Sequence, residues 1–294
     1  MAPLRVALVQ QRCGPDPDDN LHRTLTAIAE AAGRGAGLVL LQELHRGRYF
    51  CQQEDPACFD QAEPVPGPTT DALGTAAREH GVVVVGSVFE RRAPGLYHNT
   101  AVVLDADGSL AGRYRKMHIP DDPGYYEKFY FTPGDLGFEP VQTRVGRLGV
   151  LVCWDQWFPE AARLMALAGA EVLLYPTAIG WTPDDRPDEQ ARQREAWMLA
   201  QRGHAVSNGL PVLACNRTGE EPDPEHPDQG IRFWGGSFVC GPQGEILAQA
   251  ATDEECVLTV DVDLQAVEQV RRIWPFLRDR RIDAYSDLLK RFRD

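Results

Sequence analysis

Residues 148–160 read Leu-Gly-Val-Leu-Val-Cys-Trp-Asp-Gln-Trp-Phe-Pro-Glu, and they indicate the fold class. An apolar run of strand character, Leu148–Cys153, meets a turn, and Pro159 then begins a predicted helix, Pro159–Ala168. A strand that leads directly into a helix is typical of α/β proteins. This arrangement would place Cys153 at a strand's carboxyl end and near a helix N-terminus, where unpaired amides favour a thiolate. A small apolar core residue is the alternative, because most free cysteines are buried and inert.

Strands and helices alternate in the same way on both sides of this stretch. The predicted strands are Leu4–Gln10, Leu38–Glu43, Val82–Glu90, Tyr97–Leu104, Leu110–Arg115, Leu148–Cys153, Val172–Tyr175, Pro211–Asn216, Gly236–Cys240, Ile246–Ala250 and Cys256–Asp261. The predicted helices are Asn20–Arg34, Thr69–His80, Pro159–Ala168 and Pro187–Ser207. About a dozen strands are too many for one open sheet. We therefore predict two mixed sheets packed face to face, with helices outside.

The composition is that of a soluble globular protein. The chain has 294 residues, of which 43% are hydrophobic and 25% charged, and its formal net charge is −13. This charge argues against nucleic acid as a partner, because phosphate binding needs clustered Lys and Arg. Seven cysteines without a Cys-x-x-Cys pair indicate neither a disulfide framework nor a zinc site. Arg5 interrupts the first apolar stretch, and no run reaches the ~18 apolar residues of a membrane span. We expect one cytoplasmic domain, residues 1–294, with no membrane partner.

The sequence predicts no cofactor and no metal. Gly33-Arg-Gly-Ala-Gly37 follows a predicted helix and enters a strand, which reverses the order found in dinucleotide-binding loops. The sequence contains neither a phosphate-binding G-x-x-x-x-G-K-[ST] motif nor histidines paired at zinc-ligand spacing.

Two further residues at strand ends are candidates for chemistry. Glu43 ends the apolar run Leu38–Glu43, where a desolvated carboxylate would serve as a base; the alternative is a solvated carboxylate at a loop mouth. Lys116 follows the strand Leu110–Arg115 and, taken alone, would be a surface lysine. Together with Cys153 the two become informative, because α/β sheets place their sites at strand ends.

Three motifs carry a family resemblance. They are Leu40-Leu-Gln-Glu-Leu44, Tyr114-Arg-Lys-Met-His-Ile-Pro120 and Leu151-Val-Cys-Trp-Asp-Gln-Trp-Phe-Pro-Glu160. The sequence resembles the nitrilase superfamily, the carbon–nitrogen hydrolases that use a Glu-Lys-Cys triad. The resemblance implies a nitrilase-like four-layer αββα sandwich with Cys153 as the nucleophile, Glu43 as the general base and Lys116 as the oxyanion stabiliser. Through the segment Gly124–Asp135 it implies that Glu127 is a second, supporting glutamate. It also implies a homo-oligomer in which residues 270–294 form a tail at a subunit interface.

Shorter stretches narrow the substrate that the resemblance implies. Residues 43–52, 175–180, 216–217 and 274–281 are similar to those of superfamily members that act on carbamoylated diamines. The implied reaction is hydrolysis of N-carbamoylputrescine, a small cationic carbamoylated amine, to putrescine, carbon dioxide and ammonia. Trp154, Ile179 and Trp181 would line an apolar channel, and Asp121, Asp122, Asp184 or Asp185 would meet the substrate's ammonium.

Three alternatives stay open. An N-carbamoyl amino acid amidohydrolase would need a cation in the pocket, for which Arg46, Arg48 and Arg186 are candidates. A nitrilase or an aliphatic amidase would retain the same triad. A non-catalytic binding protein on the same fold would have no need of Glu43, Lys116 and Cys153.

Overall fold

The computed structural model describes residues 3–226 and 229–293, and its first large sheet comes mainly from the N-terminal half of the chain. The strand order is β15-β1-β2-β3-β4-β5. The strands are β1 (Leu4–Gln10), β2 (Leu38–Leu41), β3 (Val83–Ala93), β4 (Leu96–Leu104), β5 (Leu110–Arg115) and β15 (Cys256–Val262). β1, β2 and β3 are parallel, whereas β4, β5 and β15 pair antiparallel with their neighbours, so the sheet is mixed as predicted.

The second large sheet is also mixed and has the order β14-β13-β10-β8-β7-β6. Its strands are β6 (Val141–Thr143), β7 (Gly146–Val150), β8 (Val172–Thr177), β10 (Val212–Asn216), β13 (Phe238–Cys240) and β14 (Ile246–Gln249). β7, β8 and β10 are parallel. A small sheet of order β11-β12-β9 combines β9 (Gly180–Trp181), β11 (Thr218–Pro222) and β12 (Gly230–Trp234). The sequence did not predict these three strands.

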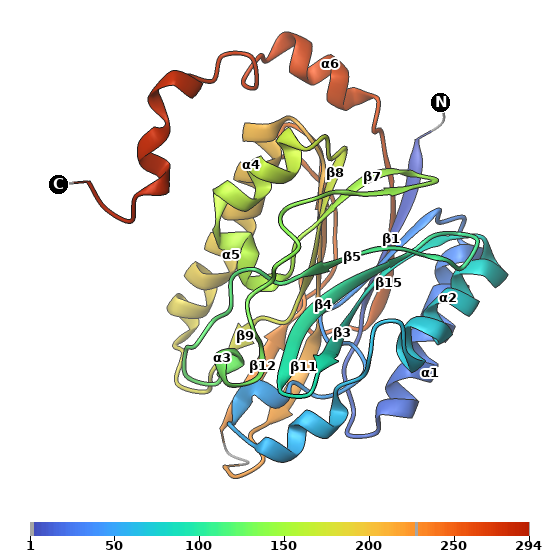
Figure 1. Ribbon diagram of the computed structural model, residues 1–294. Coiled ribbons are helices and arrows are strands. Elements are labelled where there is room, and N and C mark those ends of the chain that lie inside the picture. Colours follow the sequence, from blue (N-terminus) through green and yellow to red (C-terminus); the bar gives the residue numbers. More distant parts are fainter. Residues whose placement is uncertain (1–2, 227–228, 294) are drawn as a thin grey trace.

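Helices cover the outer face of each large sheet (Figure 1). α1 (Pro17–Gly33) and α2 (Pro68–His80) cover the first sheet, and α4 (Pro159–Leu167) and α5 (Pro187–Asn208) cover the second. Successive residues of β1 alternate between the two interfaces: Val6 and Leu8 pack toward the second sheet, and Ala7 and Val9 pack toward the helices. The chain is therefore an αββα sandwich, and the predicted fold class is confirmed.

The carboxyl ends of parallel strands from both sheets meet at one edge of the sandwich. The amide of Glu43, just beyond β2, donates to the carbonyl of Thr177 at the end of β8 (3.3 Å). β2 ends at Leu41 and β7 at Val150, so Glu43 and Cys153 lie in the turns after these strands and not within them. Both turns place polar side chains at the edge where α/β proteins build their sites.

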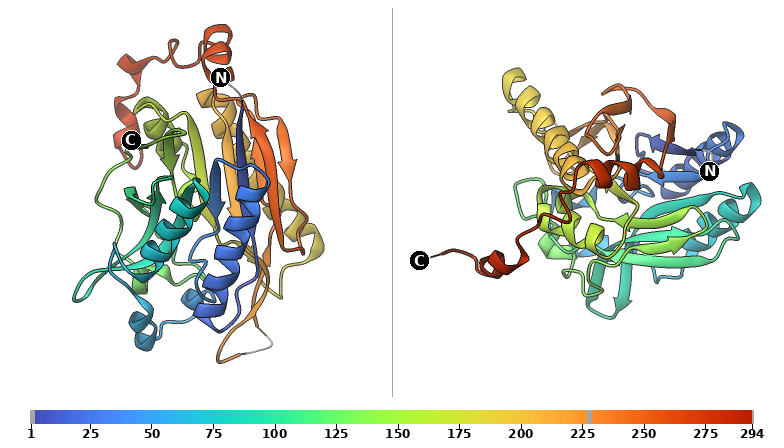
Figure 2. Two further views of the ribbon diagram at one scale, coloured as in Figure 1. Left: turned by 90° about the vertical axis from the view of Figure 1, so that its right-hand side faces the viewer. Right: turned by 90° about the horizontal axis from the view of Figure 1, so that it is seen from above.

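The C-terminal segment leaves the body of the molecule. α6 (Ala266–Ile273) lies across one end of the sandwich, and the chain beyond it extends away from the body in two views (Figures 1 and 2). Two short 3₁₀ turns, Ile282–Ala284 and Ser286–Leu289, interrupt it. Among the described residues, no helix combines the length and the apolar character needed to span a membrane.

Candidate active site

Glu43, Lys116 and Glu127 form one buried ionic cluster. Lys116 Nζ lies 2.9 Å from Glu43 Oε1 and 2.7 Å from Glu127 Oε2, and all three side chains are at most 1% exposed. Burial by itself lowers the pKa of the Lys116 ammonium, but the charges of Glu127 and Glu43 outweigh it and raise that pKa well above its ordinary value. Burial raises the pKa of Glu127 to about 7, with Glu43 adding to the rise and Lys116 opposing it. The cluster therefore contains a permanent cation between two carboxyl groups.

Cys153 lies beside this cluster on a strained turn. Its φ of 43° is in the left-handed region, and its thiol donates to the carbonyl of Ala178 at 3.7 Å. Burial first, and then the charge of Glu43, raise the pKa of the thiol well above its ordinary value, while Lys116 opposes the rise. The expectation that a helix N-terminus favours a thiolate is therefore wrong for the free protein, because the buried thiol lies beside a carboxylate. A base is needed to ionise it.

Leu44 is the second strained residue, with a φ of 48°. Among the described residues other than glycine, Leu44 and Cys153 alone have a positive φ. Each such conformation costs on the order of 1–3 kcal/mol and persists where the surroundings enforce it. Leu44 follows Glu43 and Cys153 lies beside the cluster, so the surrounding structure enforces a strained turn on each side of the site.

Two residues that the sequence analysis missed complete the contacts of the carboxylates. Asn99, in the middle of β4, donates to Glu43 Oε1 (2.6 Å), and the hydroxyl of Tyr49 donates to Glu127 Oε1 (2.7 Å). Glu43 Oε2 is buried and has no hydrogen-bond partner within the described part of the chain. The polar run His98-Asn-Thr100 inside the predicted strand Tyr97–Leu104 was the available signal for Asn99, because polar side chains within a strand of the core need partners. One oxygen of Glu43 is thus held in place while the other is left free.

Asp155 ties the cysteine turn to the lysine segment. Its Oδ2 accepts from the Val152 amide and the Tyr114 hydroxyl (both 2.9 Å), and its Oδ1 accepts from the His118 amide (3.0 Å) and lies 2.7 Å from His118 Nδ1. The His118 ring in turn stacks on Phe158 at a centroid distance of 3.7 Å. The turn that carries Cys153 and the segment after Lys116 therefore share one buried carboxylate.

The loop after β8 is held by Asn216. Its amide side chain accepts from the Ile179 amide (3.0 Å) and donates to the carbonyls of Ile179 (2.9 Å) and Gly235 (3.1 Å). The two hydrogen bonds to the Ile179 backbone fix the chain beside Ala178, whose carbonyl accepts from the Cys153 thiol.

Four of the predicted substrate-binding residues lie on three segments. Trp154 follows Cys153 directly and is partly buried, Ile179 lies in the loop after β8, and Trp181 ends β9. The Trp181 ring packs on Trp234 at a centroid distance of 5.3 Å, and its indole N–H donates to the Gln190 carbonyl (3.1 Å). Asp121 is exposed on the segment that leads to α3 (Glu127–Tyr130). Contact of these four residues with a substrate stays a prediction.

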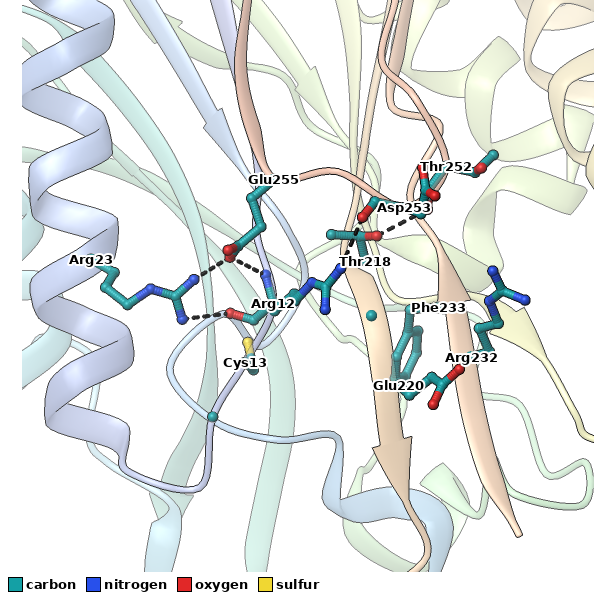
Figure 3. A pocket seen from close by; sticks show the side chains of 12 residues that line it. Arg12, Cys13, Arg23, Thr218, Glu220, Arg232, Phe233, Thr252, Asp253 and Glu255 are labelled. Carbon is teal, nitrogen blue, oxygen red and sulfur yellow. Dashed lines mark hydrogen bonds and ion pairs between the residues drawn. The ribbon is translucent and has the colours of Figure 1, made fainter. Parts of the chain in front are cut away.

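A surface cavity of about 620 Å³ lies apart from the ionic cluster, between β11, β12 and the segment after β1 (Figure 3). Arg23 pairs with Glu255 and donates to the Arg12 carbonyl, and the Arg12 side chain donates to the Asp253 carbonyl (2.9 Å). These contacts join the segment before β15 to the segment after β1. Within residues 3–226 and 229–293, no group of three or more His, Cys, Asp and Glu side chains is arranged to hold a metal ion.

Comparison with known proteins establishes the class of enzyme. The family model for carbon-nitrogen hydrolases matches residues 5–272, so the chain belongs to the carbon-nitrogen hydrolase family, as its resemblance to the nitrilase superfamily predicted. It is an amidohydrolase. The solved structure of a carbon-nitrogen hydrolase from Helicobacter pylori G27 is similar, with a TM-score of 0.96 and 52% identity over 99% of each chain.

Two curated relatives are named for narrower activities than the family as a whole. N-carbamoylputrescine amidase of Solanum lycopersicum is 46% identical over 97% of this chain and 94% of its own length. Citrullinase of Francisella tularensis subsp. tularensis is 39% identical over 99% of this chain and 100% of its own length.

Proposed function

We propose that this enzyme hydrolyses N-carbamoylputrescine to putrescine, carbon dioxide and ammonia through a covalent cysteine intermediate. One observation supports the mechanism most directly: a fully buried Lys116 is held between Glu43 and Glu127, beside the thiol of Cys153. The choice of substrate is supported by the 46% identity to N-carbamoylputrescine amidase over most of both chains.

The reaction begins at the neutral thiol. Glu43 Oε2, which is free of other partners in the described structure, takes the thiol proton as Cys153 Sγ attacks the ureido carbonyl carbon. The resulting oxyanion is stabilised by Lys116 and by the backbone N–H of Trp154. Collapse of this tetrahedral intermediate breaks one carbon–nitrogen bond, and Glu43 returns the proton to the departing nitrogen. A thioester-like intermediate is left on Cys153.

Water completes the turnover. Glu43 accepts a proton from the water molecule that attacks the same carbon, and the thiol is released with that proton. When the diamine leaves first, the carbamic acid that water releases decomposes to carbon dioxide and ammonia. Glu127 keeps the Lys116 ammonium charged and oriented throughout, since the two groups are 2.7 Å apart in a buried site.

The triad is tested by three substitutions. Cys153→Ala, Glu43→Gln and Lys116→Ala should each reduce kcat by at least ~10²-fold, since each removes a group that acts on the reacting atoms. Each variant is first shown to be folded by circular dichroism. Substantial turnover by any folded variant would contradict the role assigned to that residue.

Citrulline is the sharpest alternative substrate, because N-carbamoylputrescine is citrulline without its carboxylate. An enzyme for citrulline must offer a cation to that carboxylate, whereas one for N-carbamoylputrescine gains nothing from it. Of the three arginines considered for this role, Arg46 is paired with Asp18 and Glu63, and Arg186 is exposed beside Asp188. Arg48 is exposed and has no ion-pair partner among the described residues. Two of the three candidates thus already have carboxylate partners, which favours the diamine substrate.

The assay measures ammonia release from N-carbamoylputrescine, its homologues one carbon shorter and longer, citrulline, N-carbamoyl-β-alanine and an aliphatic nitrile. We expect kcat/KM for N-carbamoylputrescine to exceed that for citrulline by ~10²-fold or more, because a carboxylate buried without a partner is strongly rejected. Equal values for the two would refute the proposed substrate. Ammonia from the nitrile without carbamoyl activity would identify a nitrilase.

A further inference from the structure

Arg217 is a fully buried arginine directly beneath the turn that carries Glu43. It lies between β10 and β11, in the Asn216-Arg217 pair, and its side chain is 0% exposed. Nη2 donates to the carbonyls of Glu43 (2.8 Å) and Leu44 (3.0 Å), and Nη1 donates to the carbonyl of Gly47 (3.2 Å). One guanidinium therefore satisfies three carbonyls of a single turn.

The ion-pair partner of Arg217 reaches the second carboxylate of the cluster. Arg217 Nη1 lies 2.6 Å from Glu221 Oε1, and Glu221 Oε2 accepts from the Tyr49 amide at 2.5 Å. The Tyr49 hydroxyl then donates to Glu127 Oε1 (2.7 Å). The Arg217–Glu221 pair thus contacts the backbone of Glu43 on one side and, through Tyr49, the side chain of Glu127 on the other.

The geometry of this turn requires a planar, multidentate donor. Leu44 has a φ of 48°, a conformation that the surroundings must enforce. A guanidinium presents five N–H donors in a rigid fork, whereas a lysine ammonium is a point charge on a flexible stem. The guanidinium is itself fixed by packing, with its Cζ 5.1 Å from the Phe233 ring centroid and 6.0 Å from that of Tyr49.

We propose that Arg217 and Glu221 are positioning residues that hold Glu43 and Glu127 in their reactive geometry around Lys116. The inference rests on the roles proposed above for the two glutamates. A misplacement of about 1 Å in a catalytic group is enough to cost ~10²-fold in rate. Neither positioning residue touches the reacting atoms, so their loss should reduce kcat and leave substrate binding largely unchanged.

Two variants test the pair. Arg217→Met combined with Glu221→Gln removes both charges together, which avoids leaving one of them buried and unpaired. Arg217→Lys keeps the charge opposite Glu221 but loses the fork. The matched control is Arg5→Met with Asp261→Asn, an exposed pair at the amino end of β1, 2.8 Å apart. Exposed pairs of this kind contribute little, so the control should stay within about twofold of the wild type.

The readouts separate positioning from simple loss of stability. In enzyme shown to be folded by a cooperative thermal transition, we expect the double variant to lose ~10²-fold in kcat with KM within about threefold. Arg217→Lys should fall between the double variant and the wild type. If the double variant does not fold, Arg217→Lys decides by itself, since a residue that supplies only charge would be rescued by lysine.

The outcomes also distinguish this inference from the proposed function. Wild-type kcat within about twofold in either folded variant would overturn the positioning roles, since ~10²-fold is expected of misplaced groups. Absence of turnover on N-carbamoylputrescine by the wild type would overturn the proposed substrate instead. The variants would then be compared on whichever amide in the substrate series the wild type hydrolyses.

Discussion

Glu127 should set a pH limit on the reaction. Burial raises its pKa to about 7, so below that pH it binds a proton and no longer pairs as an anion with Lys116. We therefore expect kcat/KM of the wild type to fall as the pH drops below about 7. Glu127→Gln imitates the protonated form, and its kcat/KM should be lower by ~10²-fold and nearly flat between about pH 6 and 8. If kcat/KM of Glu127→Gln still falls below about pH 7 as it does in the wild type, a group other than Glu127 causes that fall.

The thiol of Cys153 should respond to Glu43 in two opposite ways. The charge of Glu43 contributes to the raised pKa of the thiol, so Glu43→Gln should lower that pKa and increase alkylation by iodoacetamide at a fixed pH near 8. The same substitution should abolish turnover, because the base is lost. Mass spectrometry of the Cys153 peptide measures the label, with Cys153→Ala as the blank. If Glu43→Gln lowers alkylation of Cys153 together with turnover, the prediction that Glu43 raises the pKa of the thiol is wrong.

At the scale of elements, Asp155 is the link between the cysteine turn and the segment after β5. It is fully buried and accepts from groups on Val152, Tyr114 and His118. Asp155→Asn replaces one acceptor oxygen with a donor that must face existing donors. We expect a loss of about 1–3 kcal/mol in the free energy of unfolding, measured in urea, and ~10-fold or more in kcat.

Tyr114→Phe is the control for this link, because it removes a single hydrogen bond to the same carboxylate. It should cost about 1 kcal/mol and leave kcat within a few-fold. If Asp155→Asn lowers the free energy of unfolding but keeps kcat within a few-fold of the wild type, as Tyr114→Phe does, Asp155 contributes stability alone.

The arrangement of the strands and helices also explains which parts of the fold and of the site could be predicted from the sequence. Glu43 and Cys153 end predicted strands and Lys116 follows one. Because strand ends of an α/β fold meet at one edge, the meeting of these residues follows from local pattern. Asn99, Tyr49 and Arg217 depend on contacts between residues far apart in the chain, for which periodicity carries no signal. β9 has only two residues and β11 reads Thr-Gly-Glu-Glu-Pro, so neither shows the apolar alternation that indicates a strand, and β12 alternates over only a few of its five residues.

At the scale of the whole molecule, the C-terminal segment is an isolated extension with an apolar surface. Beyond α6 the chain leaves the body (Figure 2), and Ile282, Leu288, Leu289 and Phe292 are each at least 65% exposed. Ordering such a segment costs conformational entropy that its own contacts do not offset. Exposed apolar patches of this kind mark interaction surfaces. The prediction that residues 270–294 pack on a second subunit therefore stands as a testable one.

Sedimentation velocity measures this prediction directly. The wild type should sediment as a dimer or a larger assembly, and Leu289→Asp, which places a charge on a side chain that is 94% exposed, should shift the protein toward monomer. Leu136→Asp is the matched control, because Leu136 is also an exposed leucine but lies outside the tail. Its assembly state should equal that of the wild type, since an exposed charge in solvent costs little. A monomeric wild type at micromolar concentration would show that the tail has a role other than subunit contact.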